Sequence, residues 1–233
     1  MTRPGTALAW VANGQVLLEQ AVAGLDDLRG PSRLPGWTRG HVVTHVARNA
    51  EGLTRLLTWA QTGIEMPMYP SVQARAADIE AGAGRPLTDQ FDDLCRTAAA
   101  FTARAAQLSP QHWQVVVRNM QNPPGPASEV VWMRVREVWL HLVDLDAGAE
   151  LDVLPEDIAT ALMRDVAGEM SSRVSARITL QVPGGEQVAL GPADGSRISV
   201  SGPVQELAGW LTGRSTGAGL TAPEGLPELP GWR

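Results

Sequence analysis

Apolar residues recur about every 3.6 positions along the first two thirds of the chain, and polar segments rich in glycine and proline separate these runs. Such a period is typical of amphipathic helices that bury one face. The pattern predicts helices over residues 6–28, 38–61, 71–81, 88–108 and 128–145, with Thr38, Thr88 and Ser128 as N-caps. Four long helices and one shorter helix, joined by loops of ordinary length, favour an antiparallel bundle.

The pattern changes after Gly148. One further helix over 155–170 precedes three short runs that alternate or are rich in β-branched residues, at 176–182, 187–190 and 197–201. A last helix over 203–213 and an extended, proline-rich tail over 221–233 complete the chain. The sequence therefore predicts an α+β protein in two domains, a helical bundle over 1–148 and a small α+β domain over 149–233.

Charge and hydropathy exclude two classes of partner. The 233 residues carry 25 acidic and 19 basic side chains, a formal net charge of −6, without a cluster of basic residues, so nucleic acid is not an expected partner. The apolar stretches are broken well before the roughly 20 residues that cross a bilayer, and no signal-peptide pattern opens the chain. We expect a cytoplasmic monomer with no membrane partner.

Cys95 is the only cysteine, so the chain can form no internal disulfide and no site built on paired cysteines. It lies in a helix-like run with no histidine nearby in the sequence, and we expect a small core residue rather than a nucleophile. If thiol chemistry occurs, the sulfur is expected to arrive with a cosubstrate.

Two pairs of residues are spaced for metal binding. His41 and His45 lie four apart in one predicted helix, and Glu137 and His141 lie four apart in another. Side chains four apart share one helix face, so two such helices could supply three or four ligands to one ion. Two imidazoles and one carboxylate would suit a catalytic zinc ion, which keeps one exchangeable position.

The same spacing also occurs by chance, and a histidine on an apolar face is often a hydrogen-bonded core residue. Two observations favour the metal. Three of the four histidines lie in these two segments, whereas the fourth, His112, lies beside Trp113 after a loop proline and is interpreted as structural. Glu137 stands in a strongly apolar helix, where a buried carboxylate without a cation or donor is costly.

Two segments carry the spaced residues: residues 34–47 read LPGWTRGHVVTHVA and residues 136–145 read REVWLHLVDL. Both resemble the metal-bearing segments of the mycothiol-dependent maleylpyruvate isomerases. The likeness extends to residues 65–69, 126–129 and 230–232, and so spans nearly the whole chain. The first segment alone marks the wider DinB-like superfamily, whereas the second segment and the C-terminal domain narrow the choice.

The resemblance implies a DinB-like four-helix bundle followed by a small C-terminal α+β domain. It implies that His45, Glu137 and His141 hold one zinc ion, and that His41 is a pocket or supporting residue. It also implies an essential arginine, for which Arg214 is the matching position. The implied reaction is the cis-to-trans isomerisation of maleylpyruvate to fumarylpyruvate in gentisate breakdown, with mycothiol as the thiol cosubstrate.

Several alternatives remain open at the level of sequence. Arg214 also suits a cation at the end of a helix, and Asp144 either orients His141 or is an ordinary helix-end carboxylate. A mycothiol S-transferase would use the same metal and thiol but would join the sulfur permanently to an electrophile. A non-catalytic zinc-binding module is a third possibility, because a fold does not determine a function.

Overall fold

The computed structural model describes residues 3–119 and 124–232 of the chain. The chain divides into two compact units, residues 1–149 and 150–233. In the described residues, the first unit holds helices and one pair of very short strands, and the second holds two α-helices and a three-stranded sheet. The predicted α+β fold class, with a helical bundle ahead of a small mixed domain, is confirmed.

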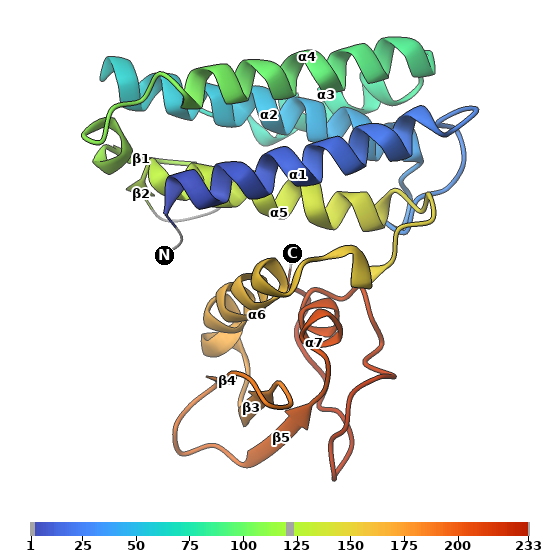
Figure 1. Ribbon diagram of the computed structural model, residues 1–233, viewed down its shortest axis with the longest axis vertical. Helices are drawn as coiled ribbons and strands as arrows, with labels where there is room; N and C mark the ends of the chain where they lie inside the picture. The colour runs from blue at the N-terminus through green and yellow to red at the C-terminus, as the bar shows by residue number, and fades with distance from the viewer. Residues whose placement is uncertain (1–2, 120–123, 233) are drawn as a thin grey trace. The chain divides into compact units, whose positions relative to one another are not determined.

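The bundle of the first unit consists of long helices and one shorter one. These are α1 (Pro4–Ala23), α2 (Arg39–Thr62), α3 (Val72–Ala83), α4 (Leu87–Ala105) and α5 (Ser128–Asp144). Figure 1 shows α1 alongside α5 and α2 alongside α4, and the shorter α3 packs on α2. Because α2 also packs on α5, the two helices that carry the spaced histidines and Glu137 are neighbours.

The start of α2 is capped as predicted. The Thr38 hydroxyl oxygen accepts the backbone N–H of His41, and the His41 ring in turn accepts the backbone N–H of Thr38. This reciprocal arrangement satisfies two of the amides that a helix N-terminus leaves without partners. The first turn of α2 is therefore rigidly defined just ahead of His45.

Other helix ends differ from the prediction. The predicted cap at Thr88 is wrong, because α4 begins at Leu87, directly after Pro86, and Thr88 lies inside the first turn. Ser128 is likewise the first helical residue of α5, with Ala127 at the cap position and no side-chain cap. Local propensity does not decide a boundary to within one or two residues, since packing on neighbouring helices also sets it.

The first helix ends at Ala23, earlier than the predicted end at residue 28. Leu28 lies in the loop after the helix, and its side chain is still buried.

The helices α1 and α5 approach each other closely. A Cβ atom at Gly14 would lie 2.7 Å from Nε1 of Trp139, so only glycine fits there. The same indole N–H donates to the carbonyl oxygen of Trp10, at 2.9 Å, which joins the two helices further.

A short ribbon between α4 and α5 was not predicted. Strands β1 (Val116–Val117) and β2 (Gly125–Pro126) pair antiparallel, and each is too short to show an alternating pattern in the sequence. The turn before them is held by His112, whose Nδ1 accepts the backbone N–H of Ser109 at 3.1 Å. This contact agrees with the structural role expected for that histidine.

The second unit contains one sheet and two α-helices. Its elements are η2 (Leu151–Val153), α6 (Glu156–Met170), η3 (Ser171–Arg173), β3 (Arg177–Gln181), β4 (Gln187–Leu190), β5 (Arg197–Ser201) and α7 (Val204–Leu211). The order in the sheet is β4-β3-β5, with β3 antiparallel to β4 and parallel to β5. All three strands and both helices were predicted, and the structure confirms them within about two residues.

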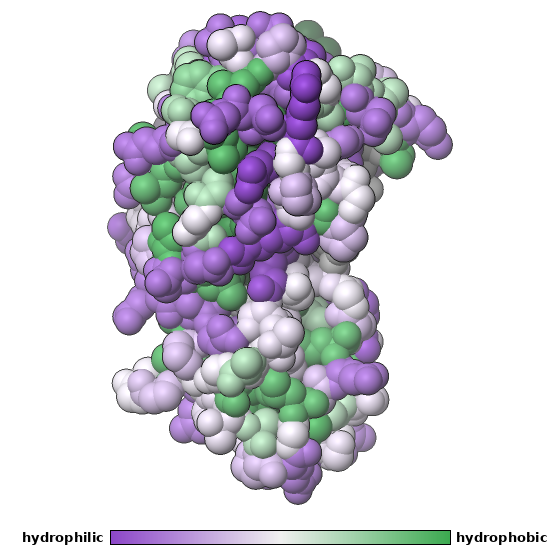
Figure 2. All heavy atoms as spheres, turned by 90° about the vertical axis from the view of Figure 1, so that its right-hand side faces the viewer, coloured by the Kyte–Doolittle hydropathy of each residue, from purple (hydrophilic) through white to green (hydrophobic). Residues whose placement is uncertain are grey.

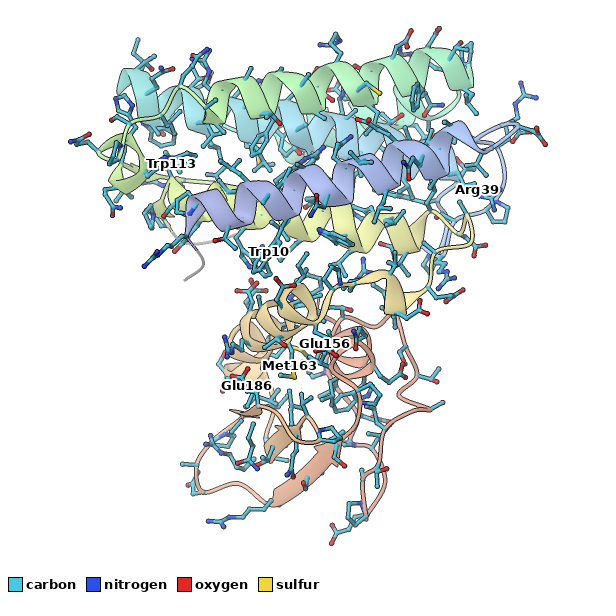
Figure 3. The ribbon with its side chains drawn as sticks, in the orientation of Figure 1. Trp10, Arg39, Trp113, Glu156, Met163 and Glu186 are labelled. Atoms are coloured by element: carbon cyan, nitrogen blue, oxygen red, sulfur yellow. The ribbon has the colours of Figure 1, made fainter. Side chains whose placement is uncertain are left out.

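One face of this sheet is buried. Its buried side chains alternate along the strands and are Ile178, Leu180, Leu190 and Val200. Met163 of α6 is fully buried and points toward the strands in Figure 3. After α7 the chain runs to residue 232 without further regular helix or strand, apart from one bridge between Thr221 and Ser201.

On the face seen in Figure 2, hydrophilic side chains are spread over the first unit, and a group of hydrophobic ones gathers on the second unit.

None of the helices within residues 3–119 and 124–232 combines the length and the apolar character that spanning a bilayer requires.

Candidate metal centre

The N-terminal end of α2 and the C-terminal end of α5 are bound to each other. Arg39, labelled in Figure 3, donates from Nε to the carbonyl oxygen of Leu145 at 3.0 Å. The backbone N–H of Arg33 donates to the carbonyl oxygen of Asp144 at 2.9 Å. These hydrogen bonds hold the first turns of α2 opposite the last turns of α5.

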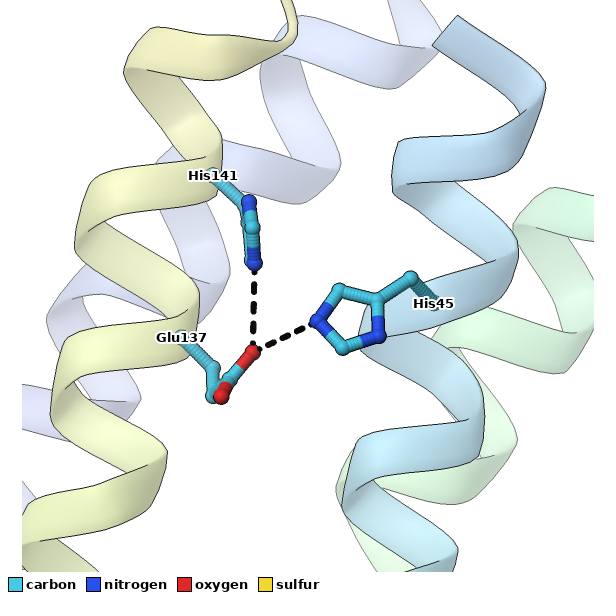
Figure 4. Close-up of side chains that lie close together, drawn as sticks. All are labelled: His45, Glu137 and His141. Atoms are coloured by element: carbon cyan, nitrogen blue, oxygen red, sulfur yellow. Dashed lines mark hydrogen bonds and ion pairs between the residues drawn. The ribbon is translucent and has the colours of Figure 1, made fainter. Parts of the chain in front are cut away.

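Between these turns, His45 of α2 lies against Glu137 and His141 of α5 (Figure 4). His45 Nε2 is 2.9 Å from Glu137 Oε2, and His141 Nε2 is 3.2 Å from the same oxygen. The three ligand atoms all lie within 4.8 Å of one another, and this is the one such group of three found within the described residues. The structure thus brings together the three residues that the resemblance singled out.

The separations suit a tetrahedral ion. Zinc binds imidazole nitrogen and carboxylate oxygen at about 2.0–2.2 Å, which places its ligand atoms roughly 3.3 Å apart. The separations of 2.9 and 3.2 Å lie close to that value, so small side-chain shifts would admit the ion. Two neutral imidazoles and one carboxylate would leave a net positive charge and one exchangeable position. The donor set therefore fits zinc.

His141 is oriented by a second carboxylate. Its Nδ1 lies 2.9 Å from Oδ2 of the fully buried Asp144, which fixes the proton on Nδ1 and leaves Nε2 as the ligand atom. Burial opposes the charged ring, but the hydrogen bonds to Asp144 and Glu137 outweigh it and raise the pKa of His141. Asp144 thus takes the orienting position rather than that of an ordinary exposed helix-end carboxylate.

Glu137 is held in its ionised form. Burial favours the protonated acid, but the charges and hydrogen bonds of His45 and His141 hold the pKa of Glu137 well below its usual range. Burial also lowers the pKa of His45, which keeps that imidazole neutral and available as a ligand. A carboxylate and a neutral imidazole are the forms that a divalent metal ion binds.

His41 does not join this group. Its Nδ1 accepts the backbone N–H of Thr38 at 3.1 Å, and its Nε2 lies 3.2 Å from Oε2 of the exposed Glu80. Nδ1 therefore takes part in capping α2, and Nε2 takes part in a contact with Glu80 of α3. The sequence offered two possible ligand pairs, His41 with His45 and Glu137 with His141. Both members of the second pair belong to the candidate metal group, whereas only His45 of the first pair does.

Arg134 is a buried arginine near this group that the sequence did not single out. Its side chain is fully buried, three residues before Glu137 on α5. Nη1 donates to the carbonyl oxygen of Val46 (2.8 Å) and to Asn49 Oδ1 (3.2 Å), and Nη2 donates to Gln15 Oε1 (3.0 Å). Burial lowers the pKa of Arg134 to about 10, which still leaves the group charged at neutral pH. A buried cation thus interacts electrostatically with Glu137 without a direct hydrogen bond between the two.

Trp37 and Arg75 contact His45, and Tyr69 contacts Arg75; no role in the site was assigned to any of the three from the sequence. The edge of the Trp37 ring faces the His45 ring, with 5.5 Å between the ring centroids. Nη2 of Arg75, on α3, lies 2.9 Å from His45 Nδ1, and the guanidinium carbon lies over the ring of Tyr69, 5.7 Å from its centroid. Two signals in the sequence could have singled out Tyr69: it is the only tyrosine of the chain, and it lies within residues 65–69 of the family resemblance.

Arg214 belongs to the second unit, where it follows α7. Its backbone N–H donates to the carbonyl oxygen of Gly209 at 2.8 Å, and its Nη1 donates to the carbonyl oxygen of Thr212 at 3.0 Å. Both bonds satisfy carbonyl groups at the end of the helix, as expected for a cation at a helix C-terminus.

Fold and site define a class of protein: a helical bundle with two histidines and one glutamate converging between α2 and α5, followed by a small α+β domain. Residues 12–146 match the family model for the mycothiol maleylpyruvate isomerase N-terminal domain, and residues 153–231 match that for the MDMPI C-terminal domain. The chain belongs to the mycothiol-dependent maleylpyruvate isomerase family.

Solved structures agree with this assignment. The chain is similar over 100% of its length, and over 100% of the other chain, to a crystal structure of the mycothiol-dependent maleylpyruvate isomerase, with 30% identity and a TM-score of 0.92. A crystal structure of a histidine-to-alanine mutant of that isomerase matches with the same coverage and identity and a TM-score of 0.91. No curated protein sequence matches the chain.

Proposed function

We propose that this protein is a mycothiol-dependent isomerase that converts maleylpyruvate to fumarylpyruvate. The observation that carries the proposal is the convergence of His45, Glu137 and His141 in a chain whose two domains both match the family models. The names of the similar solved structures support the substrate and the thiol.

The same three residues are proposed as the ligands of one zinc ion. When bound there, zinc would supply a positive charge that favours thiolate over thiol at neutral pH. Asp144 would keep the His141 ring in the tautomer that binds through Nε2.

The chemistry needs a nucleophile that can add and leave again. Rotation about an intact carbon–carbon double bond is prohibitively slow. A thiolate that adds to the conjugated alkene leaves a single bond free to rotate, and the electron pair passes to the carbonyl as an enolate. Collapse of the enolate expels the thiolate and restores the alkene in its trans form, so no thiol is consumed.

Replacing Cys95 with serine is expected to leave isomerase turnover unchanged, because the nucleophilic sulfur comes from the cosubstrate. Cys95 is only partly buried, which corrects the expectation of a core residue. Burial and the nearby Glu19 raise its pKa to about 11, so little thiolate forms at neutral pH. The checks are turnover of the variant and the rate of iodoacetamide labelling at pH 8, which should be slower than for free cysteine. Loss of turnover in the variant would contradict the prediction.

Arg214 is proposed as the arginine that binds a substrate carboxylate or the enolate formed on addition. Arg214→Ala is then expected to keep stoichiometric zinc while turnover falls by roughly 100-fold or more. Arg197→Ala, an exposed position on β5 of the same unit, is the matched control. A helix-end role alone would lower stability by less than about 1 kcal/mol and leave turnover unchanged, and that result would refute the proposed role.

The reaction itself is tested with zinc-loaded protein, maleylpyruvate, and mycothiol at a fixed, limiting concentration. The expected result is many turnovers per thiol, formation of fumarylpyruvate, and no reaction without mycothiol. If thiol disappears in step with the electrophile, the protein is a mycothiol S-transferase. If zinc binds but mycothiol causes no heat change in calorimetry, the protein is a non-catalytic zinc-binding module.

The cellular setting follows from the same proposal. A reaction that uses a free, reduced thiol suits the cytoplasm, where small thiols are kept reduced. With a net charge of −6, nucleic acid is not a proposed partner, and neither is a membrane. We treat the active form as a monomer, which size-exclusion chromatography with light scattering would check.

A further inference from the structure

Arg75 is a partly buried arginine beside the candidate metal centre that has no carboxylate partner among the described residues. Its guanidinium lies against the Nδ1 atom of His45 and over the face of the Tyr69 ring. Two other arginines near the site, Arg39 and Arg134, donate to carbonyl or amide oxygens. Arg75 is therefore a cation beside a proposed metal ion, and no carboxylate in the described part of the chain balances its charge.

The contact between Arg75 and His45 is incompatible with a metal ion on the other ring nitrogen. A guanidinium has only donors, so His45 Nδ1 must accept and the ring proton lies on Nε2, which is 2.9 Å from Glu137. A metal ion at Nε2 takes the place of that proton, and the neutral ring then carries its proton on Nδ1. Two donors would face each other, so the Arg75 guanidinium must move away from His45 in the zinc-bound protein.

Tyr69 offers a second donor at the same place. Its hydroxyl group is buried and has no hydrogen-bond partner, although buried hydroxyl groups are normally bonded. Burial, and then the charge of Glu137, raise the pKa of Tyr69 to about 12, so the phenol stays neutral and can donate. Met68, the residue before Tyr69, packs closely on α2 at Gly52. A Cβ atom added at Gly52 would lie 2.6 Å from the Met68 side chain.

We infer that Arg75 and Tyr69 form the anion-binding pair of this site and hold a carboxylate group of the electrophile beside the metal ion. A guanidinium matches a carboxylate through two parallel hydrogen bonds, and a phenol can add a third. Arg134 cannot take this role, because it is fully buried and bonded to Val46, Asn49 and Gln15. This inference rests on the proposed function for the presence of the metal and of a carboxylate-bearing substrate.

The test measures binding of maleate, a small unsaturated dicarboxylate, to zinc-loaded protein by calorimetry, together with zinc content by elemental analysis. Arg75→Met should keep stoichiometric zinc and weaken maleate binding roughly tenfold or more, because a charged hydrogen-bonding group is lost. Tyr69→Phe should weaken it severalfold, and Arg75→Lys should retain part of the affinity. Arg96→Met removes the same charge from an exposed position on α4 and should bind maleate as the wild type does.

Two results would overturn the inference: maleate affinity of Arg75→Met equal to that of the wild type, or no maleate binding by the zinc-loaded wild type. Loss of zinc from Arg75→Met would also overturn it, since Arg75 would then support His45 instead of an anion. A different result would contradict the proposed isomerisation without contradicting the anion site. A wild type that binds maleate through Arg75 but leaves maleylpyruvate unchanged would sink the proposed reaction and leave the anion site standing.

Discussion

Replacing Glu137 with glutamine is expected to deprive the protein of zinc and to reduce isomerisation to the background rate. The amide has nearly the same shape as the carboxylate, but it lacks the charge that binds the ion and that accepts hydrogen bonds from His45 and His141. Changes to groups that only orient a ligand cost about 10–100-fold in metal affinity. Removal of a ligand should exceed that range.

The measurement is zinc content after dialysis, together with a chelator competition titration of each variant. Glu129→Gln is the matched control, because Glu129 lies on α5 two turns before Glu137 and outside the metal group. Circular dichroism should show that both variants keep their helices. Stoichiometric, tightly bound zinc in Glu137→Gln would remove this carboxylate from the proposed ligand set.

Replacing Arg134 with methionine is expected to lower the free energy of unfolding by about 3–5 kcal/mol. The change leaves the carbonyl oxygen of Val46, Asn49 Oδ1 and Gln15 Oε1 without their donor in the core. It also removes the buried cation that interacts electrostatically with Glu137. Leaving buried acceptors without a donor is among the most destabilising single changes.

Urea unfolding of the zinc-loaded and the chelated protein would measure this effect and separate it from the contribution of the metal. Arg29→Met is the control, since Arg29 is exposed and its loss should change stability by less than about 0.5 kcal/mol. A loss of less than about 1 kcal/mol in Arg134→Met would contradict the prediction, and would mean that water replaces the lost donor.

The helices and strands could be predicted closely because their signals are local. A hydrophobic period, a proline or a capping threonine acts within a few residues, and Thr38 shows how well such a signal works. The signals fail where an element is very short, as in β1 and β2, or where packing decides the end, as at Ala23 and Thr88. These are differences of one element or of a few residues and leave the fold unchanged.

The candidate metal centre was predictable for a different reason. Glu137 and His141 lie one turn apart on a single helix, so the sequence spacing already places them together, and the family resemblance selects His45 as their partner. The supporting residues carry no such spacing. Arg75 reaches His45 from α3, and Tyr69, in the loop before α3, contacts Arg75. No spacing in the sequence joins either residue to His45.

The amino-acid sequence alone therefore determined the order of the long helices and of the three strands of the second unit, and the spacing of the two candidate ligands on α5. All of these depend on neighbours within a few turns. Only the tertiary structure decided that His41 caps a helix while His45 faces Glu137, that Arg134 is fully buried, and that Arg75 lies against His45. Such contacts depend on how helices distant in the sequence pack together, and a hydrophobic pattern specifies which face is buried without specifying what it meets.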